Sequence, residues 1–90
     1  MTARASVRIV NRQGLHARPI SRFVQTVGRF QVRVTVTGPD GTVADGSSVF
    51  SMMTLAAGQG AELVLDAEGA QADEALAALS TLVAEGFGEK

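Results

Sequence analysis

The only histidine of this 90-residue chain lies in the segment GLHARPISRFV, residues 14–24. Immediately after His16 the spacing of apolar residues becomes that of a helix. We therefore place His16 at the N-cap and Ala17, Arg18 and Pro19 in the first turn, where proline is tolerated because the amides there lack helical acceptors. The free amides of Ala17 and Arg18, with the positive end of the helix dipole, predict an anion site beside the imidazole.

The chemistry that these residues could perform is phosphoryl transfer. The helix dipole disfavours a second proton on the His16 ring, so we expect a largely neutral imidazole with a lone pair available for nucleophilic attack. Arg18 adds a planar guanidinium suited to phosphoryl oxygen atoms. Together they predict a phosphoramidate on His16, a bond that transfers readily. A simpler interpretation stays open here, in which His16 only caps the helix and Arg18 is a solvated charge.

The elements that must position this segment follow from the period of the apolar residues. Alternation predicts strands over residues 3–9, 31–37, 42–45 and 61–67, with a turn at the GPDG of residues 38–41. Helical spacing predicts helices over residues 17–27, from Ser47 or Ser48 to the GQG of residues 58–60, and over 72–83. Four strands and three helices in this order predict an α+β two-layer sandwich.

Composition limits the class of protein. Ninety residues with 46% apolar content predict one domain, residues 1–90, with a single core. The chain has no cysteine, which excludes disulfides, thiolate metal sites and cysteine nucleophiles, and we expect no metal and no cofactor. The sequence shows neither a signal peptide nor a membrane span, so we expect a cytoplasmic protein without membrane insertion.

Charge is distributed unevenly although the net charge is only −1. All seven arginines lie within the first 33 residues, and all nine acids and the single lysine follow. A basic half can bind nucleic acid or dock on an acidic protein. The near absence of lysine and the lack of tyrosine and tryptophan disfavour nucleic acid, so we expect no nucleic-acid partner.

The segment that follows Ser48 carries two apolar stripes. One contains Met52, Leu55 and Ala56, and the other contains Val49, Phe50 and Met53. Because a short helix cannot bury both, we expect one stripe in the core and the other as a contact surface for partners. That Phe50 and Met53 are simply core residues is the alternative.

GLHARP resembles the active-site signature of the HPr family, the histidine-containing phosphocarriers of the bacterial phosphoenolpyruvate-dependent phosphotransferase system. SSVFSMMTL resembles the second, serine-bearing signature of that family. The resemblance implies a βαββαβα open-faced sandwich, with a four-stranded antiparallel sheet covered on one face by three helices. It implies that His16 is phosphorylated at Nδ1, that Arg18 assists transfer, and that the partners are enzyme I and an enzyme II (IIA) component.

The same resemblance implies roles around the second signature. Val49, Phe50 and Met53, with Arg22 nearby, match the face on which partners dock. Ser48 matches a regulatory serine that HPr kinase/phosphorylase modifies in many relatives, while a plain N-cap is the alternative. The local pattern departs from the family, because Ser47 replaces a frequent lysine and Ser51 a frequent glycine. One extra residue, most easily placed in the GPDG turn, separates the two signatures.

Three classes of function compete. The first is a monomeric phosphocarrier, itself not an enzyme, that serves either a sugar or a nitrogen-related branch of the phosphotransferase system. The second is a regulatory module that binds partners without phosphoryl turnover. The third, a hydrolase using His16 with Ser48 or an acid, is disfavoured because no oxyanion-forming glycine motif or metal-ligand spacing accompanies the histidine.

Overall fold

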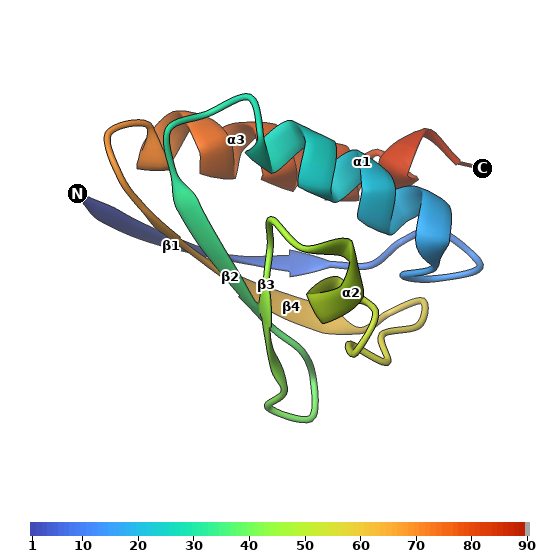
Figure 1. The fold of residues 1–90 in the computed structure, drawn as a ribbon. Helices are drawn as coiled ribbons and strands as arrows, with labels where there is room; N and C mark the ends of the chain where they lie inside the picture. Colours follow the sequence, from blue (N-terminus) through green and yellow to red (C-terminus); the bar gives the residue numbers. More distant parts are fainter. Residues whose placement is uncertain (90) are drawn as a thin grey trace.

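A computed structural model describes residues 1–89 of the chain. Its elements are, in order, β1 (Thr2–Arg8), α1 (Ala17–Val27), β2 (Arg33–Thr37), β3 (Val43–Asp45), α2 (Val49–Met52), β4 (Glu62–Glu68), α3 (Ala72–Ala84) and the short helix η1 (Gly86–Gly88). The strands form one antiparallel sheet in the order β1-β4-β2-β3. The three α-helices lie on one face of this sheet (Figure 1). The predicted α+β open-faced sandwich is confirmed.

Strict alternation along the strands sends one set of side chains into the core and the other to the open face of the sheet. Across the β1–β4 pair, Ala5 lies opposite Leu65 and Val7 opposite Leu63 on the core side. Helices α1 and α3 lie next to each other above these residues (Figure 1). They bury most of the apolar positions predicted for both helices, and each large buried side chain contributes about 1.5–3 kcal/mol. The large buried side chains are Ile20, Phe23, Val27, Leu76, Leu79 and Val83.

The second helix is shorter than predicted. It ends at Met52, whereas the apolar spacing had placed its end near residue 57. After Met52 the amides of Thr54 and Leu55 bond the carbonyls three residues back, and the Thr54 hydroxyl also donates to Ser51 O. These tight bonds turn the chain out of the helix. As a result Ala56, expected in the buried stripe, is exposed.

The final helix is followed by a segment that the sequence analysis did not assign. In this segment η1 brings the end of the chain back beside the start of α1 (Figure 1). No helix within residues 1–89 is long and apolar enough to cross a membrane.

Candidate functional site

His16 occupies the N-cap of α1, as predicted, with an extended backbone (φ −108°, ψ −169°). Its carbonyl accepts the first helical hydrogen bond, from Ile20 N at 3.0 Å. The Ala17 and Arg18 amides precede that bond, so they have no acceptor within the helix. The imidazole makes no capping hydrogen bond and its side chain is 36% exposed. His16 is thus at the N-cap position without a capping hydrogen bond from its side chain, and its ring is partly exposed.

Gly14 fixes the loop that carries His16. Its φ is +70°, and a Cβ there would lie 2.7 Å from both Ala57 O and Gly58 Cα. The Leu15 amide donates to Ala57 O at 2.9 Å. The loop therefore packs backbone against backbone on the segment that leaves α2, and only glycine fits this approach.

The His16 ring is held by a residue that the sequence analysis missed. His16 Nε2 lies 3.0 Å from Glu89 Oε1, and the buried side chain of Asn11 places its Nδ2 3.0 Å from the same oxygen. The hydrogen bond with His16 lowers the pKa of Glu89. Partial desolvation raises this pKa, whereas the hydrogen bond from Asn11 and the charge of Arg18 lower it further. An ionised carboxylate only accepts hydrogen bonds, so Nε2 is the donor in this contact, and a neutral ring with hydrogen on Nε2 would carry its lone pair at Nδ1.

An open hollow of about 390 Å³ adjoins this pair. The exposed side chains of Arg18 and Arg22 project from α1 into its lining, as the helical wheel predicted. The full lining is Arg12, Gln13, Arg18, Arg22, Gly88 and Glu89. None of the three arginines forms a salt bridge with another residue that the structure describes. Their guanidinium groups are therefore available to an anion bound beside His16.

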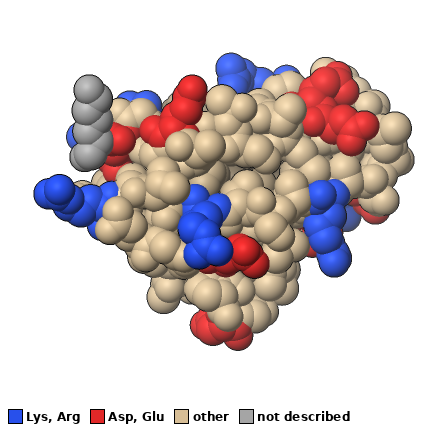
Figure 2. All heavy atoms as spheres, turned by 180° about the vertical axis from the view of Figure 1, so that it is seen from behind, with Lys and Arg blue, Asp and Glu red and all other residues tan. Residues whose placement is uncertain are grey.

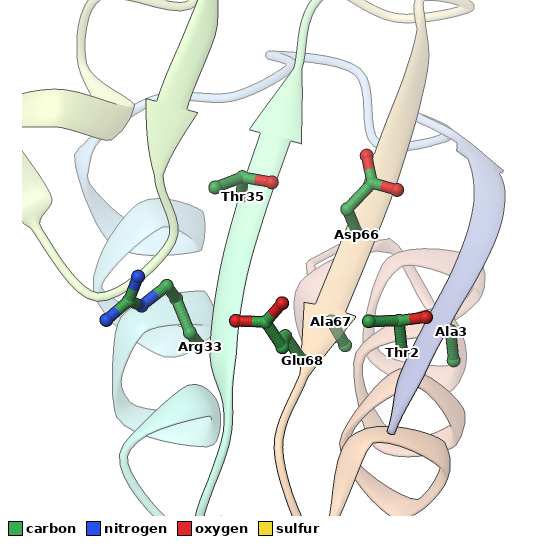
Figure 3. A pocket seen from close by; sticks show the side chains of 7 residues that line it. All are labelled: Thr2, Ala3, Arg33, Thr35, Asp66, Ala67 and Glu68. Carbon is green, nitrogen blue, oxygen red and sulfur yellow. The ribbon is translucent and has the colours of Figure 1, made fainter.

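A second hollow, of about 270 Å³, lies on the open face of the sheet, near the start of β1 (Figure 3). One of its acids, Asp66, is paired with a residue outside the lining: Arg4 Nε lies 2.7 Å from Asp66 Oδ1 across the β1–β4 pair. Arg8 likewise faces Glu62 at 3.8 Å. The basic N-terminal half thus does not form one continuous surface. Seen from behind, the molecule carries basic and acidic groups intermingled (Figure 2).

The start of α2 follows the prediction closely. Ser48, not Ser47, is the N-cap, and its Oγ accepts from Ser51 N at 3.2 Å. Ser47 instead bonds the Asp45 carboxylate.

The two apolar stripes also separate. Met52 and Leu55 are buried, whereas the side that the sequence marked as a contact surface is exposed: Val49 at 38%, Phe50 at 85% and Met53 at 58%. The alternative that Phe50 and Met53 are core residues is wrong.

Within residues 1–89 no three His, Asp or Glu side chains gather in a way that could hold a metal ion. The site offers an imidazole beside the free Ala17 and Arg18 amides and arginines without salt bridges to the described residues. This arrangement suits nucleophilic capture of a phosphoryl group.

Comparison with known proteins gives consistent matches over nearly the whole chain. Residues 3–85 match the family model described as the PTS HPr component phosphorylation site. The phosphocarrier protein HPr of Pseudomonas aeruginosa is 43% identical over 83 residues, 92% of each chain. The phosphocarrier protein NPr of Escherichia coli K12 is 35% identical over 89 residues, 99% of each chain. Among solved structures, HPr-C-His from Thermoanaerobacter tengcongensis superposes with a TM-score of 0.91 at 36% identity, covering 98% of both chains.

Proposed function

This chain belongs to the HPr family of phosphocarrier proteins, and on that premise we propose that His16 accepts a phosphoryl group from phospho-enzyme I and passes it to an enzyme II component. The observation that carries the proposal is the partly exposed imidazole at the N-terminus of α1, whose Nε2 lies 3.0 Å from Glu89 Oε1, which leaves Nδ1 for the new bond. Nδ1, which Glu89 does not contact, is the nitrogen that the family resemblance implies as the phosphorylated one.

The transfer itself is a displacement at phosphorus. Nδ1 of His16 forms the new nitrogen–phosphorus bond while the bond to the donor breaks, and the donor atom leaves with the electron pair. In this proposal the Ala17 and Arg18 amides and the Arg18 guanidinium donate hydrogen bonds to the phosphoryl oxygens. The second transfer, to the acceptor, reverses these roles. The protein is then a substrate of its partner enzymes and not an enzyme.

The exposed side of α2 supplies the proposed docking surface, which we define as Val49, Phe50 and Met53 with Arg22 of α1. Its apolar centre and cationic border suit a partner with an apolar patch surrounded by acids. Phosphorylation of Ser48 would place a dianion at the N-terminus of α2, where the amides accept it without unfolding, but inside the docking surface. We propose that this modification slows transfer from enzyme I.

The test uses purified protein with phosphoenolpyruvate, magnesium and enzyme I. We expect one acid-labile phosphate per chain, absent in His16→Ala. Label in that variant equal to wild type would refute the assignment. Offering the phosphorylated protein to IIA proteins of the sugar branch and of the nitrogen-related branch then identifies the acceptor.

A regulatory module that docks without turnover is the alternative. It predicts full binding of partners by His16→Ala together with unchanged regulatory effects of that variant. Failure of wild-type protein to acquire label, combined with normal partner binding, would favour it.

A further inference from the structure

The hollow of about 390 Å³ at the end of the chain is lined by residues other than His16. Glu89, which does line it, lies 3.0 Å from Nε2 of the His16 ring. The proposed transfer uses Nδ1, which Glu89 does not contact. Phosphoryl transfer therefore gives a role to Arg18 in this lining, but not to the other two arginines, Arg12 and Arg22.

Three segments that are distant in the sequence form the hollow. Arg12 comes from the loop before α1, and Arg18 and Arg22 lie four residues apart on α1, about 6 Å along its axis. The guanidinium of Arg22 reaches the C-terminal turn, because a Cβ at Gly88 would lie 2.7 Å from Arg22 Nη1. Glycine at this position leaves the space that the guanidinium occupies. The arginines are thus brought together by the fold and not by their spacing alone.

The charge of the lining indicates the charge of its ligand. The three arginines contribute three positive charges and Glu89 contributes one negative charge, which leaves +2. None of the three arginines forms a salt bridge with a described residue. The pKa of Glu89 is lowered, chiefly by its hydrogen bond with His16, so this carboxylate is ionised at neutral pH. A doubly charged anion would neutralise the lining, and guanidinium groups match the oxygen atoms of a phosphate.

We propose that this hollow is a binding site for a phosphate dianion, either free inorganic phosphate or the phosphate group of a small monoester, held by Arg12, Arg18 and Arg22. The Gln13 side chain also lines the hollow and adds an amide that can donate to an oxygen of the ligand. The volume of about 390 Å³ lies within the range of small-molecule pockets, so it leaves room for the organic part of an ester.

Arg18 connects this site with phosphoryl transfer. Its guanidinium lines the hollow and is also the group that the proposed function assigns to the phosphoryl oxygens. A bound dianion therefore competes with the donor for Arg18 and repels the incoming phosphoryl group. This consequence, a slower transfer to His16, rests on the proposed function, whereas binding of the dianion does not.

The first experiment measures binding without any partner enzyme. Protein labelled with ¹⁵N is titrated at constant ionic strength and about pH 7.5, where phosphate monoesters are doubly charged. The ligands are inorganic phosphate, methyl phosphate and, as a singly charged control of the same shape, methyl sulfate. We expect saturable shifts of the Arg12, Gln13 and Gly88 amide resonances with both phosphates. Shifts confined to the Ala17 and Arg18 amides would overturn the proposal, because they would place the anion at the helix N-terminus alone.

The three ligands also identify the anion. Tighter binding of methyl phosphate than of inorganic phosphate supports a monoester as the ligand, and equal or weaker binding supports the free anion. We expect methyl sulfate to bind about fivefold more weakly than methyl phosphate because it carries one charge less. Equal binding of methyl sulfate and methyl phosphate would contradict a site for a dianion.

Arg12 offers the clearest substitution, because it is exposed and has no role in the proposed transfer. We expect Arg12→Gln to weaken binding of methyl phosphate about fivefold, as for an exposed ion pair, and Arg12→Lys to weaken it less. Arg33→Gln, which removes an arginine from the open face of the sheet, is the matched control and should bind like wild type. Equal weakening by Arg12→Gln and Arg33→Gln would show attraction by net charge alone and would overturn the proposal.

Transfer from phospho-enzyme I tests the consequence for the reaction. At a concentration of methyl phosphate that fills most wild-type sites, we expect phosphorylation of wild type to slow about threefold and that of Arg12→Gln to slow less. Equal slowing of the two proteins would place the effect on enzyme I and refute the competition for Arg18. If methyl phosphate binds as expected but wild type accepts no phosphoryl group from enzyme I, the proposed function fails and the binding site stands.

Discussion

The hollow beside the His16–Glu89 pair and the hollow on the open face of the sheet differ in the charge of their linings. Three arginines and one carboxylate line the first, whereas one arginine and two carboxylates line the second. On the open face, strand pairing sets acids directly opposite arginines, as with Arg4 and Asp66. Beside His16, three arginines and one carboxylate line the hollow, and that carboxylate, Glu89, is already bonded to His16 and Asn11. The excess of arginines over acids in the first hollow, with no salt bridge from these arginines to the described residues, makes it the candidate anion site.

The largest expected effect contrasts Arg18 with Arg33 of the open face. Arg18→Ala removes charged hydrogen bonds to the phosphoryl group, worth about 1.5–3 kcal/mol, so transfer from phospho-enzyme I should slow about 10- to 100-fold. Arg33→Ala should leave the rate unchanged. Single-turnover transfer measured by rapid quench gives both values. Equal slowing by the two variants would show that the arginines act only through overall charge.

A second contrast compares two exposed apolar side chains, Phe50 of α2 and Val43 of the open face, 85% and 63% exposed. Phe50→Ala should weaken binding to enzyme I by about 1–2 kcal/mol, or about 5- to 30-fold in Kd, as for an interface anchor. Val43→Ala should not change Kd. Calorimetric titration measures both, and denaturant unfolding checks that neither stability changes by more than about 0.5 kcal/mol. Unchanged binding by Phe50→Ala removes α2 from the docking surface.

A third contrast uses pH. Because the pKa of Glu89 is lowered in the folded protein, the folded state binds fewer protons than the unfolded state in mildly acidic solution. The stabilisation that Glu89 provides is thus present above its ordinary pKa of about 4.3 and is lost as the pH falls through the lowered value. The melting temperatures of wild type and Glu89→Gln should differ at neutral pH and converge in acid.

Glu68→Gln, which removes a carboxylate from the open face, controls in that pH experiment for the change in net charge. A constant difference between wild type and Glu89→Gln at all pH values would show that the Glu89 hydrogen bonds do not depend on its ionisation.

The smallest effect belongs to the open face itself. Arg4 and Asp66 are exposed, with side chains 74% and 37% accessible, so their coupling in a double-mutant cycle should be about 0.2–1 kcal/mol. It should diminish with added salt, and none of the variants should alter phosphoryl transfer. A coupling free energy well above this range would show that the Arg4–Asp66 pair stabilises the fold more than an exposed ion pair is expected to.

The sequence correctly predicted the features that depend on residues close together along the chain. His16 at the N-cap, Arg18 and Arg22 on the outer side of the helix, and Ser48 as the second N-cap all follow from local spacing. The end of α2 was misplaced because apolar residues continue to residue 57, and their period alone does not distinguish a helix from a tight turn that buries Leu55.

What the sequence did not show depends on contacts between distant positions. Glu89 lies 73 residues from His16 and 78 from Asn11 along the chain, and no local period connects them. The one available signal was Gly-Phe-Gly after the final helix, because glycines on both sides of a large apolar residue indicate a reversed turn anchored in the core. The sequence also did not show that the arginines are divided between two surfaces, because that division depends on which residues of neighbouring strands lie opposite each other.

The position of β1 has a consequence for synthesis of the protein. This strand is at the edge of the sheet and its only neighbour is β4, whose residues are translated some 60 positions later (Thr2 pairs with Glu68). Such distant pairing is entropically costly and forms late. On the ribosome, therefore, the nascent chain emerges with its histidine long before the scaffold around it can close. Incomplete translation products that end before β4 also lack Glu89, the residue that contacts the His16 ring.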